Sequence, residues 1–175
     1  MATKHQQAGV TMMELMVVVA IAAILAAVAV PSFNGFINQT AQDSTVSQLV
    51  SDMNRARSEA IKRNTRMLIC VRDAAGTDCG NGTNWQNGWL ICYDTNEDGT
   101  CDTTAPPDGS ASNPIVVHQA LGAKLTLTGL ANLIRFNPNG TQGGGTASTL
   151  AVGGTWAGAT AKTINIAPTG HIAKP

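Results

Sequence analysis

The first thirty residues constrain this chain more than any other stretch. Residues 10–30 are apolar except for Thr11 and one acidic residue, Glu14. As an α-helix rising about 1.5 Å per residue, such a stretch spans roughly 31 Å, which matches the hydrocarbon core of a bilayer. A carboxylate inside a span of this kind is costly, so Glu14 is a candidate functional residue.

The residues before the apolar run are as informative as the run itself. An ordinary secretory signal places its cleavage site after the apolar segment. Here a short leader, residues 1–9, carries Lys4 and ends in Gly9, before the apolar run begins. Cleavage after Gly9 would leave the apolar segment on the mature chain, with Val10 as the new N-terminus.

This arrangement resembles the prepilin signal of type IV pilins and type II secretion pseudopilins. The resemblance implies cleavage by prepilin peptidase between Gly9 and Val10, N-methylation of Val10, and a single-pass anchor in the inner membrane with the C-terminal domain in the periplasm. It also implies that Glu14 pairs with the N-terminal amine of a neighbouring pilin during assembly, a contact that burial strengthens. Val10 replaces the usual Phe of the family.

The residues after the membrane segment predict a helix and then a β-rich domain. Pro31, followed by Asn34-Gly35, predicts a kink or a locally unwound stretch. A helical pattern resumes within residues 31–64 and should end near Asn64, with a polar face that includes Gln42 and Asp52 directed to water or to a neighbouring subunit. Its apolar stripe consists of Val46, Leu49, Val50, Met53, Ala56, Ala60 and Ile61.

Residues 65–175 predict a globular domain of strands. About 145 residues remain beyond the leader and the membrane segment, which is enough for one domain with a core. We expect an α+β fold, in which the long N-terminal helix packs on a small antiparallel β-sheet domain, and a mobile glycine-rich loop near residues 140–160. The expected strands are Met67–Val71, Trp89–Tyr93, Pro114–Val117, Lys124–Thr128, Leu133–Phe136 and Lys162–Ala167.

Four cysteines fall into two similar units, each an apolar strand followed by a glycine-containing loop. A domain outside the inner membrane permits disulfides. The equal spacing favours the pairs Cys70–Cys79 and Cys92–Cys101, and the rival pairing is Cys70–Cys92 across neighbouring strands. A zinc site is disfavoured, because no pair has the short C-x₂₋₄-C spacing.

Several further motifs resemble the GspH/FimT branch of the pilin-like proteins, whose members are minor pseudopilins and minor pilins. They are Ser58-Glu59-Ala60-Ile61-Lys62-Arg63-Asn64, a strand containing Cys70, Gly88-Trp89-Leu90 with Asp94-x-Asn96-x-Asp98-Gly99, and Val117-His118. The resemblance covers most of the chain and is nearest to the FimT-type minor pilin. It implies a non-enzymatic subunit of a type IV pilus, with a type II secretion pseudopilin as the alternative.

One loop resembles a calcium site. Asp94, Asn96 and Asp98 alternate, and Gly99 takes the sixth position, as in calcium-binding loops. The twelfth position is Ala105 rather than glutamate. The sequence therefore favours an ordinary acidic turn over a metal site, and no cofactor is expected.

The C-terminal third raises a DNA-receptor hypothesis. The net charge is zero, but no acidic residue follows Asp108. Pilus-associated relatives that bind DNA carry a Gly-Arg-x-Arg motif, whereas Gly170 here is followed by His171 and Ala173 in place of both arginines. Only weak, salt-sensitive contacts with double-stranded DNA are expected. The candidates for them are Lys124, Arg135, Lys162, His171 and Lys174.

Catalysis is not expected from this sequence. His5 would be removed with the leader, and neither His118 nor His171 has an evident nucleophile partner. The functional hypotheses are therefore a pilus subunit, a secretion pseudopilin and a DNA-receptor module.

Overall fold

The computed structural model describes residues 10–102 and 113–175, apart from the side chains of residues 28–32. The chain divides into two compact units, Met1–Ile37 and Asn38–Pro175, and each is described by itself. Asp108, the last acidic residue of the sequence, lies outside the described residues, as do Gly9 and Ala105.

One helix, α1 (Met12–Arg63), contains 52 residues. Its assignment continues through Pro31 and Asn34-Gly35, so the locally unwound stretch expected there is wrong. A proline removes only one backbone donor, and the ladder can continue on both sides of it. The bend that Pro31 predicts stays a prediction. The helix ends where expected, because Asn64 adopts a left-handed φ of 50°.

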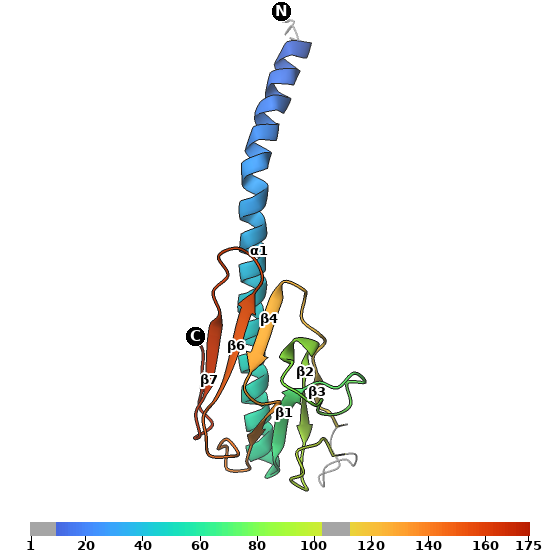
Figure 1. Ribbon diagram of the computed structural model, residues 1–175, viewed down its shortest axis with the longest axis vertical. Helices are drawn as coiled ribbons and strands as arrows, with labels where there is room; N and C mark the ends of the chain where they lie inside the picture. The colour runs from blue at the N-terminus through green and yellow to red at the C-terminus, as the bar shows by residue number, and fades with distance from the viewer. Residues whose placement is uncertain (1–9, 103–112) are drawn as a thin grey trace, which may run out of the picture. The chain divides into compact units, whose positions relative to one another are not determined.

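The antiparallel β-sheet domain that the sequence predicted consists, in the Asn38–Pro175 unit, of two four-stranded sheets (Figure 1). The first has the order β3-β2-β1-β5, with β1 (Met67–Val71), β2 (Trp89–Tyr93), β3 (Val116–Val117) and β5 (Leu133–Phe136). The second has the order β4-β6-β7-β8, with β4 (Leu125–Gly129), β6 (Ser148–Gly154), β7 (Lys162–Ile166) and β8 (Ile172–Ala173). A short 3-10 helix, η1 (Trp85–Asn87), precedes β2.

The strand β6 corrects the prediction of a mobile loop at residues 140–160. Leu150 and Val152 are buried in the core, and β6 pairs with both β4 and β7. Gly153 and Gly154 continue the strand because neighbouring side chains occupy the space above them. A Cβ on Gly154 would lie 1.8 Å from the ring of Trp156, and one on Gly153 would lie 2.6 Å from Thr126 Oγ1.

The C-terminal part of α1 packs its apolar stripe against the sheets of its own unit. Val46, Leu49, Met53, Ala56 and Ala60 are buried in one core with residues of both sheets, as predicted, and β6 and β7 lie beside this part of the helix (Figure 1). That core buries apolar side chains from helix and strands together, which is the main stabilising term of the unit.

Three side chains of the same helical segment were predicted wrongly. Ile61 is exposed, whereas Gln42 and Asp52 of the expected polar face are buried. The Gln42 side-chain amide donates to the carbonyl oxygens of Val152 at 2.7 Å and Thr160 at 2.8 Å. These bonds satisfy a buried polar group and connect α1 to the β6–β7 region.

The strand β1 is buried on both faces. Met67, Ile69 and Val71 join the core beneath α1, while Leu68 and Cys70 join a second, smaller core. This second core consists of Leu68, Cys70, Leu90, Cys92 and Cys101, with Cys79 and Leu133 packed against it. Cystine sulfur therefore covers the face of the first sheet that α1 does not cover.

Candidate functional site

The start of α1 contains the predicted assembly residue, Glu14. Thr11 caps the helix, because its Oγ1 accepts the backbone N–H of Glu14 at 3.2 Å. A carboxylate in the first helical turn also interacts favourably with the helix dipole. The sequence pattern Thr11-x-x-Glu14 carries this cap signal, which the sequence interpretation missed.

The side chains around Glu14 are apolar and exposed. Val10 is 71% exposed, and Met12, Met13 and Leu15 are also exposed. Surface of this size and polarity indicates a contact with another apolar phase or chain. Within the described residues, no helix is long and apolar enough to cross a membrane.

The two predicted disulfides are confirmed. Cys70 is bonded to Cys79 and Cys92 to Cys101, each pair nine positions apart in sequence. We call residues 70–79 the first stapled loop and residues 92–101 the second stapled loop. Their sulfurs adjoin, since Cys79 Sγ and Cys101 Sγ lie 4.0 Å apart. The two loops therefore lie against each other over the first sheet, and each is closed by its own disulfide.

Asp78 joins the two stapled loops through hydrogen bonds. Its Oδ1 accepts the backbone N–H of Cys79 at 2.6 Å and that of Cys101 at 2.8 Å. One carboxylate oxygen thus holds the end of each loop, which fixes their mutual position.

The second stapled loop contains the calcium-like sequence. Asp94 is fully buried, and neither of its carboxylate oxygens has a hydrogen-bond partner among the described residues. Burial raises the pKa of Asp94, while the N–H groups of Gly99 and Asp98 and the charge of Arg66 act in the opposite direction. Arg66 Nη1 is 4.0 Å from Asp94 Oδ2, whereas Arg66 Nη2 pairs with Glu97 at 2.9 Å.

Asn96 and Asp98 are exposed on the same loop. The Asn96 amide donates to Asp98 Oδ2 at 2.9 Å, and Asp98 Oδ1 accepts the backbone N–H of Thr100 at 2.8 Å. The bonds from Thr100 and Asn96 lower the pKa of Asp98. The structure therefore brings the three predicted oxygen donors, Asp94, Asn96 and Asp98, into one turn.

A buried polar cluster that the sequence interpretation missed joins α1 to β2 and β3. Asp52 Oδ2 accepts the Trp89 Nε1–H at 2.9 Å and lies 2.9 Å from His118 Nε2, and the two rings stack with centroids 4.5 Å apart. His118 and Trp89 were noted in the sequence, but Asp52 was placed on the solvent side. The Gln48 amide also donates to Asp52 Oδ1 at 3.3 Å, so both oxygens of the buried carboxylate have partners, and the cluster connects α1 to the first sheet.

The predicted DNA contacts are distributed over both sheets. Lys162 on β7 pairs with Asp43, and Lys174 beyond β8 donates to Ser47 Oγ at 3.1 Å. Lys124 precedes β4, at the opposite edge of the second sheet, and Arg135 belongs to β5 of the first sheet. His171 is exposed beside β8. DNA binding by these residues stays a prediction.

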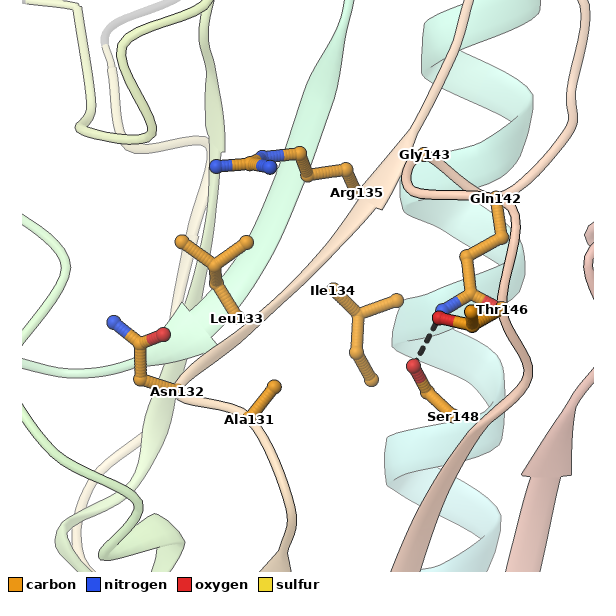
Figure 2. A pocket seen from close by; sticks show the side chains of 9 residues that line it. All are labelled: Ala131, Asn132, Leu133, Ile134, Arg135, Gln142, Gly143, Thr146 and Ser148. Atoms are coloured by element: carbon orange, nitrogen blue, oxygen red, sulfur yellow. Dashed lines mark hydrogen bonds between the residues drawn. The ribbon is translucent and has the colours of Figure 1, made fainter.

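Arg135 lines a cleft of about 290 Å³ between β5 and the segment that leads into β6. Figure 2 shows its guanidinium directed away from Gln142 and Ser148, which hydrogen-bond to each other on the far side of the cleft. The Nε of Arg135 and the Oε1 of Gln142 are both buried without a hydrogen bond among the described residues. Arg135 is thus a partly buried residue rather than a free surface cation.

Comparison with solved structures defines the class of protein. The chain is similar to the type IV minor pilin FimU of Pseudomonas aeruginosa in one crystal form, with a TM-score of 0.54 and 22% identity over 80% of this chain and 92% of that chain. A second crystal form of FimU gives a TM-score of 0.51 and 22% identity over 76% and 91%. These likenesses establish the fold: a pilin-like α+β protein.

The family follows from sequence. The family described as "Type II transport protein GspH" matches residues 45–170, and the prokaryotic N-terminal methylation motif matches residues 4–30. The chain belongs to the GspH family. It is therefore a protein of the minor pilin or pseudopilin class, as the motifs around Glu59, Trp89 and His118 predicted.

Curated relatives agree with this membership. The chain is 31% identical to a type IV major fimbrial protein FimA of Dichelobacter nodosus over 124 residues, which cover 70% of this chain and 68% of the relative. A second FimA of the same organism is 35% identical over 85 residues, covering 48% and 47%. The matched proteins are named as pilus or transport components, and none of the names describes an enzyme.

Proposed function

We propose that this chain is a minor pilin that prepilin peptidase cleaves between Gly9 and Val10. After cleavage, Val10 is N-methylated, residues 10–30 hold the chain in the inner membrane, and residues 38–175 lie in the periplasm. The mature chain then assembles with other pilins into or at the tip of a type IV pilus. The match of residues 4–30 to the N-terminal methylation motif is the observation that carries this proposal.

A physical argument supports a role for Glu14 in that assembly. The residue lies in the first turn of α1, close to the amine that cleavage would create at Val10, and it is surrounded by exposed apolar side chains. When subunits pack, those side chains become buried together with both charges. An unpaired buried charge costs about 3–5 kcal/mol, so a subunit positions itself where the carboxylate meets a neighbour's amine.

The test is the substitution Glu14→Gln, which keeps the size of the side chain and removes its charge. We expect normal membrane levels and cleavage but about a tenfold or greater loss of the subunit from sheared filaments. The matched control is Glu59→Gln on the same helix, where Glu59 pairs with Arg63 at 2.5 Å. Equal incorporation of Glu14→Gln and wild type would contradict the proposal.

A second candidate is a minor pseudopilin of a type II secretion system. The name of the matching family, a type II transport protein, favours it. A deletion strain separates the two candidates. Loss of surface pili with normal release of secreted proteins supports the pilin, and the reverse result supports the pseudopilin.

A further inference from the structure

The second stapled loop contains a buried carboxylate, Asp94, whose one ion-pair contact among the described residues is a long one, to Arg66. Asp94 has no exposed side-chain surface, and both of its oxygens lack a hydrogen bond among the described residues. The nearest cation, Arg66, is 4.0 Å away at Nη1 and forms its close ion pair with Glu97 instead. Because a buried ionised group is costly unless it is paired or bound to a metal, Asp94 needs a positive charge at this position.

The backbone around Asp94 has the shape that a cation loop requires. Gly99, five residues on, has a φ of 84°, which gives the sharp turn of the sixth loop position. The backbone N–H groups of Gly99 and Asp98 lie near the Asp94 carboxylate without meeting hydrogen-bond geometry. The carboxylate is therefore directed into the loop, not away from it.

Three connections hold the two ends of the loop together. The Asp102 N–H donates to the Tyr93 carbonyl at 3.0 Å, Asp102 Oδ2 accepts the N–H of Thr95 at 2.8 Å, and the Cys92–Cys101 disulfide closes the same segment. A closed loop loses little conformational entropy when a ligand binds, because the covalent and hydrogen-bonded links have already ordered it.

We propose that the second stapled loop binds one calcium ion. The ligands are the side-chain oxygens of Asp94, Asn96, Asp98 and Asp102 and the carbonyl oxygen of Thr100, at loop positions 1, 3, 5, 9 and 7. Water completes the six to eight oxygens that calcium takes. This site goes beyond the proposed filament function and does not depend on it.

The chemistry favours calcium over magnesium. The donors are all oxygens on a flexible turn, and a backbone carbonyl is among them, whereas magnesium demands near-ideal octahedral geometry and keeps most of its water. No glutamate stands at the twelfth position to give a bidentate contact. We therefore expect a dissociation constant of about 10⁻⁴–10⁻³ M, the range of extracellular modules.

Calorimetric titration of the detergent-solubilised, oxidised full chain with calcium tests the site. We expect one ion per chain, and about tenfold or weaker binding for Asp98→Asn, whose exposed side chain can change without emptying the core. Glu97→Gln is the matched control, because it removes a charge from the same loop at a position that is not a ligand. Its affinity should fall by no more than about threefold at moderate salt.

Two results would overturn the site. One is the absence of calcium binding up to about 10 mM, tenfold above the expected range. The other is an equal loss of affinity in Glu97→Gln and Asp98→Asn, which would indicate diffuse attraction to an acidic surface. Asp94→Asn should also abolish binding, with tryptophan fluorescence as the check that the variant is folded.

Discussion

The two stapled loops have the same covalent design and opposite electrostatics. Each closes with a disulfide between cysteines nine positions apart, and each carries an aspartate near its first cysteine. In the first loop, Asp73 Oδ1 accepts the N–H groups of Gly76, Thr77 and Asp78 at 2.6, 2.9 and 3.2 Å. In the second loop, Asp94 is buried, and its oxygens accept no such bond within the part of the chain that the structure describes.

The pKa values of the two carboxyls reflect this difference. Burial alone would raise the pKa of Asp73, but the backbone N–H groups of Asp78, Thr77 and Gly76 together lower it. Burial raises the pKa of Asp94. The first loop thus satisfies its carboxylate with backbone N–H groups, whereas the second leaves a buried carboxylate for which we propose a bound cation.

The largest expected effect comes from the disulfides. Replacing either pair by alanine, as C70A/C79A or C92A/C101A, should cost about 2.5–3 kcal/mol, because each bond closes a loop of the same length. Urea unfolding of the detergent-solubilised chain, followed through the buried residues Trp85 and Trp89, measures this loss. Losses that differ by more than about 1.5 kcal/mol would mean that native packing, not loop closure, sets the contribution of each disulfide.

The local sequence pattern predicted the two disulfides but not the different environments of Asp73 and Asp94. The equal spacing of the cysteines and the apolar strands before them were sufficient to pair Cys70 with Cys79 and Cys92 with Cys101. Asp94 is buried next to Arg66 and the turn at Gly99, and contacts of this kind produce no periodic pattern from which they could be predicted.

The same distinction explains the other outcomes. The stripe from Val46 to Ala60 repeats at helical spacing, so its burial was predictable. Gln42 and Asp52 are buried because they bond to Val152, Trp89 and His118, which are distant in sequence. The strand β6 was missed because Gly153 and Gly154 are typical of a loop. The side chains that cover these glycines, Thr126 and Trp156, lie outside the strand.

The next prediction concerns Asp73. Asp73→Asn keeps one acceptor oxygen and removes the charge that strengthens three hydrogen bonds, so it should cost about 1 kcal/mol at pH 7. Since the folded pKa of Asp73 is lowered, its contribution is present above the unfolded value near 3.9 and is lost as pH falls through the folded value. Urea unfolding at pH 7 and pH 3 should show the gap between wild type and variant closing. A gap that widens in acid would contradict the assignment.

Asp94→Asn should have the opposite sign when calcium is absent. The amide removes a buried charge that has no hydrogen bond, so in the presence of a chelator we expect stability to stay equal or to rise by up to about 1 kcal/mol. Unfolding in a chelator and in excess calcium separates the cost of the buried charge from the stabilisation by bound calcium. Calcium should stabilise wild type and leave the variant unchanged. A loss above about 1 kcal/mol in the chelator would show that Arg66 already compensates the charge.

The smallest effects belong to the two turn glycines, Gly76 with φ 76° and Gly99 with φ 84°. Alanine at either position should cost about 1 kcal/mol, because a Cβ disfavours left-handed backbone. The nearest atoms to the added Cβ would belong to the flexible side chains of Arg72, at 3.2 Å, and Arg135, at 2.9 Å, so steric terms stay small. Equal losses in urea unfolding, with calcium binding weakened only in Gly99→Ala, would separate the two loops by function rather than by stability. Weaker calcium binding in Gly76→Ala would instead show that the adjoining loops act as one site, because Asp78 and the neighbouring sulfurs connect them.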